Sequence, residues 1–253
     1  MHLQEPITPS PEGPTTTTTK TTIIDEKNTP TEITIKSDLH DNTTSTTPRP
    51  LYFAYGSNLS FTQMKIRCTY NPALSANPVA IARLDQWRWL ICEAGYANVI
   101  PPASLRVGKQ DTDGEKVPVS GDDDAIYGVL YEMAPEDELL LDGYEDVDHK
   151  AGPAKSGGKV PVSIRPTEQG EGDYNKWYLP ATVTEWLDEG QRGRRGDVSE
   201  QTVLVYVDEE RVQVGLPREE YVPRMNRAIR EAEELGFPKD WADEVMWKYI
   251  PKI

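Results

Sequence analysis

The sequence of 253 residues is poor in histidine and cysteine, the residue types that most often hold zinc or form disulfides. Its three histidines, His2, His40 and His149, are scattered. Zinc sites need His and Cys at short, regular spacings, so we expect no metal site. The two cysteines, Cys68 and Cys92, are expected to remain reduced thiols, since no secretory leader is recognisable.

Positive charge and long apolar runs are also scarce. The chain has 27 Lys and Arg against 42 Asp and Glu, a net charge of -15. Such a surface repels polyphosphate and anionic lipid, so we expect neither nucleic acid nor membrane as a partner. No run approaches the ~20 apolar residues that span a bilayer. The N-terminus has no signal or transit pattern, which favours a cytoplasmic location.

Residues 1–50 contain almost nothing that could be buried. Thr and Pro dominate this segment, and five consecutive threonines run from Thr15 to Thr19. A segment of this composition is predicted to be disordered, because it cannot bury enough apolar surface to offset its conformational entropy. A glycosylated stalk would need a secretory route. We therefore expect a disordered tail over residues 1–50 and one folded domain over residues 51–253.

Order is predicted to begin at Leu51 with a short apolar strand that ends at Gly56. Ser60 and Gln63 have the spacing of a capping box, which predicts that a helix starts there. Further strands are expected at residues 79–84, 87–92, 97–100, 125–133, 178–186 and 202–207, and helices at 136–141, 221–235 and 241–249. Gly143 should end the first of these helices before Glu145. Residues 148–173 and 189–197 are predicted to be exposed loops, and the strands indicate a closed or nearly closed sheet.

The turn from Tyr55 to Leu59 is the first candidate for function. A glycine after an apolar strand lets the backbone turn sharply, so that the following amides face outward at the start of a helix. Ser57 and Asn58 add side-chain donors and acceptors, which could hold a carboxylate or a carbonyl oxygen. A tight turn with a helix cap is the simpler interpretation of this segment taken alone.

Glu145 is the second candidate. It lies among Leu141, Tyr144 and Val147, and a partly desolvated carboxylate can serve as a general base near neutral pH. Most of the 42 acidic residues are expected to be surface charge, so Glu145 alone is a weak signal. A hydrolase pair of Ser57 and His149 is not favoured, because the sequence has no Gly-x-Ser-x-Gly elbow and no orienting acid is identifiable.

Together these two segments resemble the γ-glutamylcyclotransferases. That family is marked by a Tyr-Gly-Ser-Asn-Leu loop after the first strand and by a glutamate that follows a Leu-Asp segment. The similarity extends over residues 81–84, 127–133 and 215–217, and covers most of residues 51–250 in order. The resemblance implies an α+β fold, a small mixed β-barrel with flanking helices, and no cofactor.

The resemblance also implies a reaction, in which a γ-glutamyl amino acid or amine cyclises to 5-oxoproline and releases its amino acid or amine. Glu145 would take a proton from the substrate's α-amine and pass it to the leaving amine. The family pattern assigns the γ-glutamyl substrate to these residues: Tyr52, Phe53, Ala54, Tyr55, Gly56, Ser57, Asn58 and Leu59. It adds Tyr178 on the strand after the glutamate, and Tyr206 on a later strand.

Several points stay open at this stage. The leaving group can be an amino acid, an amine or a peptide. Glutathione is less favoured, because its dedicated cyclotransferases carry a Gly-Tyr-Gly-Ser-Leu type of string where this chain has residues 54–58. A non-catalytic binding module of the same fold is the main alternative function. A third alternative places the function in the Thr-rich tail as an interaction segment. The chain could act as a monomer or a homodimer.

Overall fold

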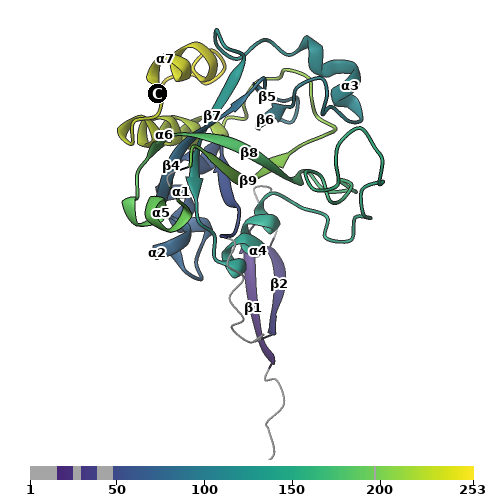
Figure 1. Cartoon of the computed structure of the whole chain (residues 1–253), viewed down its shortest axis with the longest axis vertical. Helices are drawn as coiled ribbons and strands as arrows, with labels where there is room; N and C mark the ends of the chain where they lie inside the picture. Colours follow the sequence, from purple (N-terminus) through teal and green to yellow (C-terminus); the bar gives the residue numbers. More distant parts are fainter. Residues whose placement is uncertain (1–15, 25–29, 39–47, 197) are drawn as a thin grey trace, which may run out of the picture. The chain divides into compact units, whose positions relative to one another are not determined.

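The computed structural model describes residues 16–24, 30–38, 48–196 and 198–253, which form parts of two compact units (Figure 1). In the first unit, Met1–Thr47, strand β1 (Thr16–Ile24) pairs antiparallel with β2 (Pro30–Asp38). The predicted disordered tail therefore includes a described hairpin, while residues 1–15, 25–29 and 39–47 lie outside the described residues. A lone two-stranded hairpin is marginally stable in water.

The second unit, Pro48–Ile253, is built on a closed barrel of five strands. Their order around the barrel is β3 (Leu51–Ala54), β7 (Ala125–Tyr131), β4 (Pro78–Asp85), β8 (Asn175–Trp186) and β9 (Glu200–Val207). Four of the pairings are antiparallel, and β3 pairs parallel with β9 to close the barrel. The predicted α+β fold with a small mixed barrel is confirmed.

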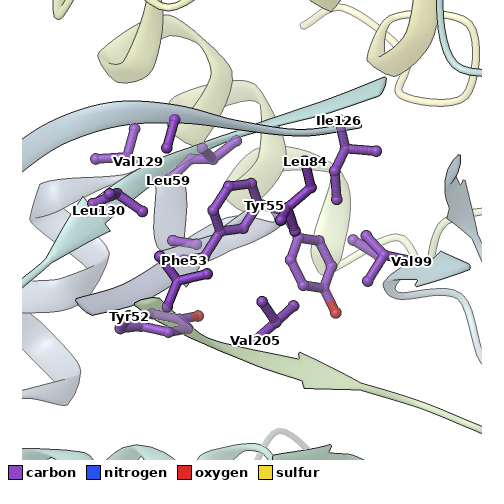
Figure 2. Packing of buried hydrophobic residues seen from close by; sticks show 14 of the residues in the cluster. Tyr52, Phe53, Tyr55, Leu59, Leu84, Val99, Ile126, Val129, Leu130 and Val205 are labelled. Atoms are coloured by element: carbon purple, nitrogen blue, oxygen red, sulfur yellow. The ribbon is translucent and has the colours of Figure 1, made fainter. Parts of the chain in front are cut away.

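Close packing around β3 holds the barrel together. Every residue of this strand is buried, and Phe53 and Tyr55 lie among aliphatic side chains from several strands, including Leu84, Val129 and Val205 (Figure 2). Gly128 of β7 permits this approach. A Cβ atom there would lie 2.5 Å from the Phe53 ring and 2.7 Å from the carbonyl oxygen of Ala54. The barrel therefore needs glycine at this point.

Helices and one separate hairpin surround the barrel (Figure 1). The hairpin is β5 (Arg88–Ile91) with β6 (Ala97–Ile100). The helices are α1 (Phe61–Arg67), α2 (Pro72–Ser75), α3 (Lys109–Asp113), α4 (Pro135–Tyr144), α5 (Glu189–Arg195), α6 (Tyr221–Glu234) and α7 (Lys239–Trp241), with short 3-10 turns at Ser57–Leu59 and Gly114–Lys116. The apolar stripe of α6 is buried as its periodicity predicts.

The predicted helix start at Ser60 is confirmed. The Ser60 hydroxyl accepts a hydrogen bond from the backbone N–H of Gln63 at 2.9 Å, which satisfies one of the free amides at the start of α1. The Gln63 side chain does not return to the cap, because its oxygen accepts a hydrogen bond from Arg227 of α6. Ser60 also donates to Glu231 of α6 at 2.7 Å, so the start of α1 is tied to α6.

Three helix predictions differ from the structure. Residues 189–197 were expected to form a loop, but Glu189–Arg195 is the helix α5, capped by the Asp188 carboxylate. Helix α4 continues through Gly143 to Tyr144, and Glu145 is its C-cap. A glycine inside a helix costs only about 1 kcal/mol, which tertiary contacts can offset. At the C-terminus, α7 is short and is followed by a π-helical segment over Ala242–Met246, where one longer helix was expected.

The segment over residues 148–173 was expected to be an exposed loop, and most of its residues are exposed or half-buried. It contains no helix or strand beyond the isolated bridge between Pro153 and Thr167. Four of its side chains are nevertheless buried, namely Ala154, Val160, Arg165 and Gln169. These residues anchor the segment to the barrel.

Cys68 and Cys92 are both buried and are not joined in a disulfide, as predicted. Burial, together with the charge of Asp137, raises the pKa of the Cys68 thiol to about 12, and Arg67 lowers it only in part. The thiol is therefore protonated at neutral pH. Among the described residues, no helix combines the length and apolar character that a membrane span requires.

Candidate active site

The turn after β3 is held by a contact with the start of α6. The backbone N–H of Ser57 donates to the hydroxyl of Tyr221, at the start of α6, over 3.3 Å. A Cβ atom on Gly56 would lie 2.9 Å from that hydroxyl and 3.2 Å from the Cβ of Ala97. Glycine is therefore needed at position 56 for the close approach of Tyr221 and Ala97. The Ser57 amide, expected to face a ligand, is held by Tyr221 instead.

Asn58 connects the turn to the predicted acid. Its Nδ2 donates to the Tyr52 hydroxyl at 2.9 Å and to Glu145 Oε1 at 3.2 Å. Its Oδ1 accepts a hydrogen bond from Arg67 Nη1 at 3.2 Å. The Asn58 side chain is buried, so each of these bonds forms away from bulk water. The two segments that the sequence marked separately, 87 residues apart, meet here.

Glu145 is positioned by the end of α4 and by a buried arginine. Its backbone N–H donates to the Leu141 carbonyl at 2.9 Å, which places the side chain just beyond the last turn. Arg67 Nη1 donates to Glu145 Oε1 at 2.9 Å. The side chain of Arg67 is only 4% exposed and that of Glu145 is 15% exposed. The Arg67 guanidinium also lies over the Tyr144 ring, 4.9 Å from its centroid. One carboxylate oxygen thus receives two hydrogen bonds from the protein.

Three buried tyrosines pack together beside Asn58. The Tyr52 ring stacks against Tyr131 and meets Tyr206 edge-on, with centroids 6.4 and 5.5 Å away. Burial raises the pKa of all three phenols, and the charge of Glu145 raises that of Tyr52 further. The phenols therefore remain protonated donors. Tyr131 donates to the Leu59 carbonyl at 3.1 Å, and Tyr206 donates to Asp142 Oδ1 at 2.6 Å.

The remaining residues of the segment 52–59 support the turn from within the core. Phe53, Ala54 and Leu59 are completely buried in the core, so they support the turn and offer no surface to a ligand. The Tyr55 ring lies in the same packed cluster (Figure 2). Its hydroxyl donates to the Tyr206 carbonyl at 2.6 Å, and its own carbonyl accepts a hydrogen bond from Trp89 Nε1 at 2.9 Å.

The two tyrosines predicted from later strands both lie near Asp142. Tyr206 of β9 contacts Tyr52, so it joins the cluster around Asn58. Tyr178 of β8 is opposite Leu204, and the charged groups that affect its hydroxyl are Lys176, Glu138, Asp142 and Arg49. Lys176 itself forms ion pairs with Glu138 at 2.6 Å and with Asp142 at 3.0 Å. Tyr178 therefore belongs with this polar cluster.

Sequence reasoning missed Arg67, Tyr221 and Asp142 as parts of the site. Arg67 is in the last turn of a helix that was predicted, yet its partner lies 78 residues away. Tyr221 was identified only as an apolar position of α6. No local pattern marks such long-range contacts. Among the described residues, no group of three or more His, Cys, Asp and Glu side chains could hold a metal ion.

Comparison with known proteins does not assign the chain to a family. No family model matches the chain, and no curated protein matches its sequence. Among solved structures, the chain is similar to the crystal structure of YkqA from Bacillus subtilis, a structural genomics target. The two share 12% sequence identity, the match covers 94% of this chain and 72% of YkqA, and the TM-score is 0.45. Similarity at this level does not identify a family.

Proposed function

We propose that this protein is a γ-glutamylcyclotransferase, which converts a γ-glutamyl amino acid or amine to 5-oxoproline and the free amino acid or amine. One observation carries the proposal. The Asn58 amide, from the Gly-Ser-Asn turn, donates to Glu145 Oε1 over 3.2 Å. The two sequence features that resemble this enzyme family are therefore parts of one cluster.

The proposed chemistry needs one proton carrier and a well-ordered site. The α-amine of the substrate attacks its own γ-carbonyl carbon, and a new C–N bond closes a five-membered ring. Glu145 accepts the proton that the α-amine loses and returns it to the leaving nitrogen as the original C–N bond breaks. Proton transfer of this kind typically contributes about 10²- to 10⁴-fold to the rate. Holding the chain in a ring-closing conformation contributes further.

The surroundings of Glu145 suit this role. Arg67 and Asn58 fix Oε1, so the carboxylate cannot rotate freely. Tyr52, Tyr131 and Tyr206 pack against one another beside Asn58, which supports the side chain that holds Glu145.

The test is a product assay with γ-glutamyl-alanine and the full chain, in which 5-oxoproline is measured by mass spectrometry. We expect Glu145→Gln to lower kcat at least about 10²-fold, since the amide cannot accept the proton. Glu136→Gln, in the first turn of the same helix, is the matched control and should keep wild-type turnover. Thermal unfolding checks that both variants fold. Wild-type turnover by Glu145→Gln would refute the mechanism.

A non-catalytic binding module is the second candidate. It is favoured by the buried ion pair of Glu145 with Arg67, in which the carboxylate is already engaged at 2.9 Å. In that case calorimetry would detect binding of γ-glutamyl-alanine, while prolonged incubation would produce no 5-oxoproline. Turnover that depends on Glu145 would exclude this second candidate.

A further inference from the structure

A cavity of about 430 Å³ lies under the segment 148–173. Its walls come from three parts of the chain, around residues 107–108, 154–170 and 209–210. Small-molecule sites typically have volumes of about 300 to 1,000 Å³, so this cavity has a suitable size. None of the residues assigned to the reaction above lines it. The proposed reaction therefore does not account for this cavity.

A buried ion pair forms part of its lining. Arg165 is 7% exposed and Glu209 is 4% exposed. Arg165 Nε donates to Glu209 Oε1 at 2.8 Å, and Arg165 Nη2 donates to Glu209 Oε2 at 2.6 Å. Glu209 Oε1 also accepts hydrogen bonds from Trp177 and Asn175 of β8, at 2.9 and 2.8 Å. This network holds the segment on the barrel and fixes the guanidinium in place.

Not all N–H groups of Arg165 are used in its hydrogen bonds to other side chains. Its hydrogen bonds within the described residues use Nε and Nη2, with Glu168 as a second partner of Nη2. None of them uses Nη1, although a guanidinium carries five N–H donors. Burial disfavours the charged form, but Glu209 and Glu168 outweigh this effect and raise the pKa of Arg165. A fixed, charged guanidinium with spare donors at a cavity suits a carboxylate ligand.

The rest of the lining carries charge of both signs. Lys155 and Lys159 contribute cations, and Glu168 and Glu210 contribute carboxylates. Lys159 already pairs with Asp111, and Glu210 pairs with Lys109 at 3.4 Å. A multiply charged anion would be repelled by the carboxylates, whereas a zwitterion can use both signs.

We propose that this cavity is a second binding site, for a small zwitterionic α-amino acid. The ligand carboxylate would contact Arg165 and Lys155, and its ammonium group would contact Glu210. A short side chain would then pack on Val107 and Val160, which also line the cavity. This proposal does not depend on the cyclotransferase activity.

Calorimetric titration of the full chain with L-alanine tests the proposal. We expect alanine to bind, and acetate and ethylammonium, which each carry one of the two charges, to bind at least about tenfold more weakly. Lys155→Met and Glu210→Gln should each weaken alanine binding about tenfold, since each removes one charged contact. Both residues are exposed, so the melting temperature should stay unchanged. Arg165→Met is avoided because it would break the buried pair.

Glu145→Gln is the control for the other site and should leave alanine affinity unchanged. Three results would overturn the proposal. The first is no alanine binding below about 10 mM. The second is that Lys155→Met and Glu210→Gln leave the affinity for alanine unchanged, or that Glu145→Gln lowers it. The third is inorganic phosphate binding more tightly than alanine, which would make the cavity an anion site.

Discussion

At the scale of single residues, Arg67 is the group on which the candidate site depends most. It contacts both Glu145 and Asn58 and is almost completely buried. A buried ion pair is not a strong source of stability in itself, because both charges lose their hydration. Removal of one partner is costly, however, since the other charge loses its counter-charge at a poorly solvated position.

We predict that Arg67→Met lowers the free energy of unfolding by about 3 kcal/mol, because Glu145 would lose its buried counter-charge. The double variant Arg67→Met/Glu145→Gln should lose less than the sum of the two single variants. Urea unfolding measures all three. Arg83→Met is the control, because Arg83 pairs with Asp85 and Asp123 at the surface, and it should change stability by no more than about 1 kcal/mol. If the losses of the two single variants simply added up in the double variant, Arg67 and Glu145 would not be coupled.

The residue scale also shows which parts of the site could be predicted. Asn58 and Glu145 lie in distinctive sequence strings, so the resemblance identified them. Arg67 and Tyr221 are ordinary helix residues in the sequence, and only the fold brings them to Glu145 and Ser57. Phe53, Ala54 and Leu59 belong to the same string as Asn58, but the barrel buries them. A short motif therefore does not distinguish residues that contact a ligand from those that support them.

At the scale of elements, the approach of β3 to β7 limits what β7 can contain. Gly128→Ala would place a methyl group against the Phe53 ring and the Ala54 carbonyl, at 2.5 and 2.7 Å. We expect a loss of about 2 to 3 kcal/mol in unfolding free energy, since neither the ring nor the backbone can easily move. The control is Gly193→Ala in α5, where a Cβ would have no neighbour within 4 Å. That variant should gain up to about 1 kcal/mol. Equal stability of the two variants would contradict this packing.

Most of the elements could be predicted from the sequence, and helix α5 is an exception with an identifiable cause. Short apolar runs bounded by Gly, Pro and Asp located all five barrel strands of the second unit to within a few residues. Helix α5 was missed because Gly190 and Gly193 weaken its local helical preference. It forms because Asp188 caps it and because Arg195, whose side chain is only 3% exposed, donates to the Arg49 carbonyl. Such tertiary contacts override local propensity.

At the scale of the whole molecule, the division into two units leads to a deletion experiment. Deletion of residues 1–47 should shift the melting temperature by less than about 4 °C, which corresponds to about 1 kcal/mol. Pro48 is the right starting point, because Arg49 forms an ion pair with Glu138 at 2.7 Å and donates to the Met133 carbonyl. Calorimetry and the 5-oxoproline assay should give matching results for the full and truncated chains. A large loss in either measurement would show that the first 47 residues are part of the domain.

The pairing of β3 with β9 has a consequence for synthesis of the chain. Leu51 is opposite Val203, and Tyr52 is opposite Leu204, so the first and last strands of the barrel are neighbours. Until β9 has been synthesised, the edge of β3 that pairs with it has no partner. Unpaired strand edges promote aggregation. The turn that carries Asn58 therefore emerges early but cannot be fully supported until nearly the whole domain has been made.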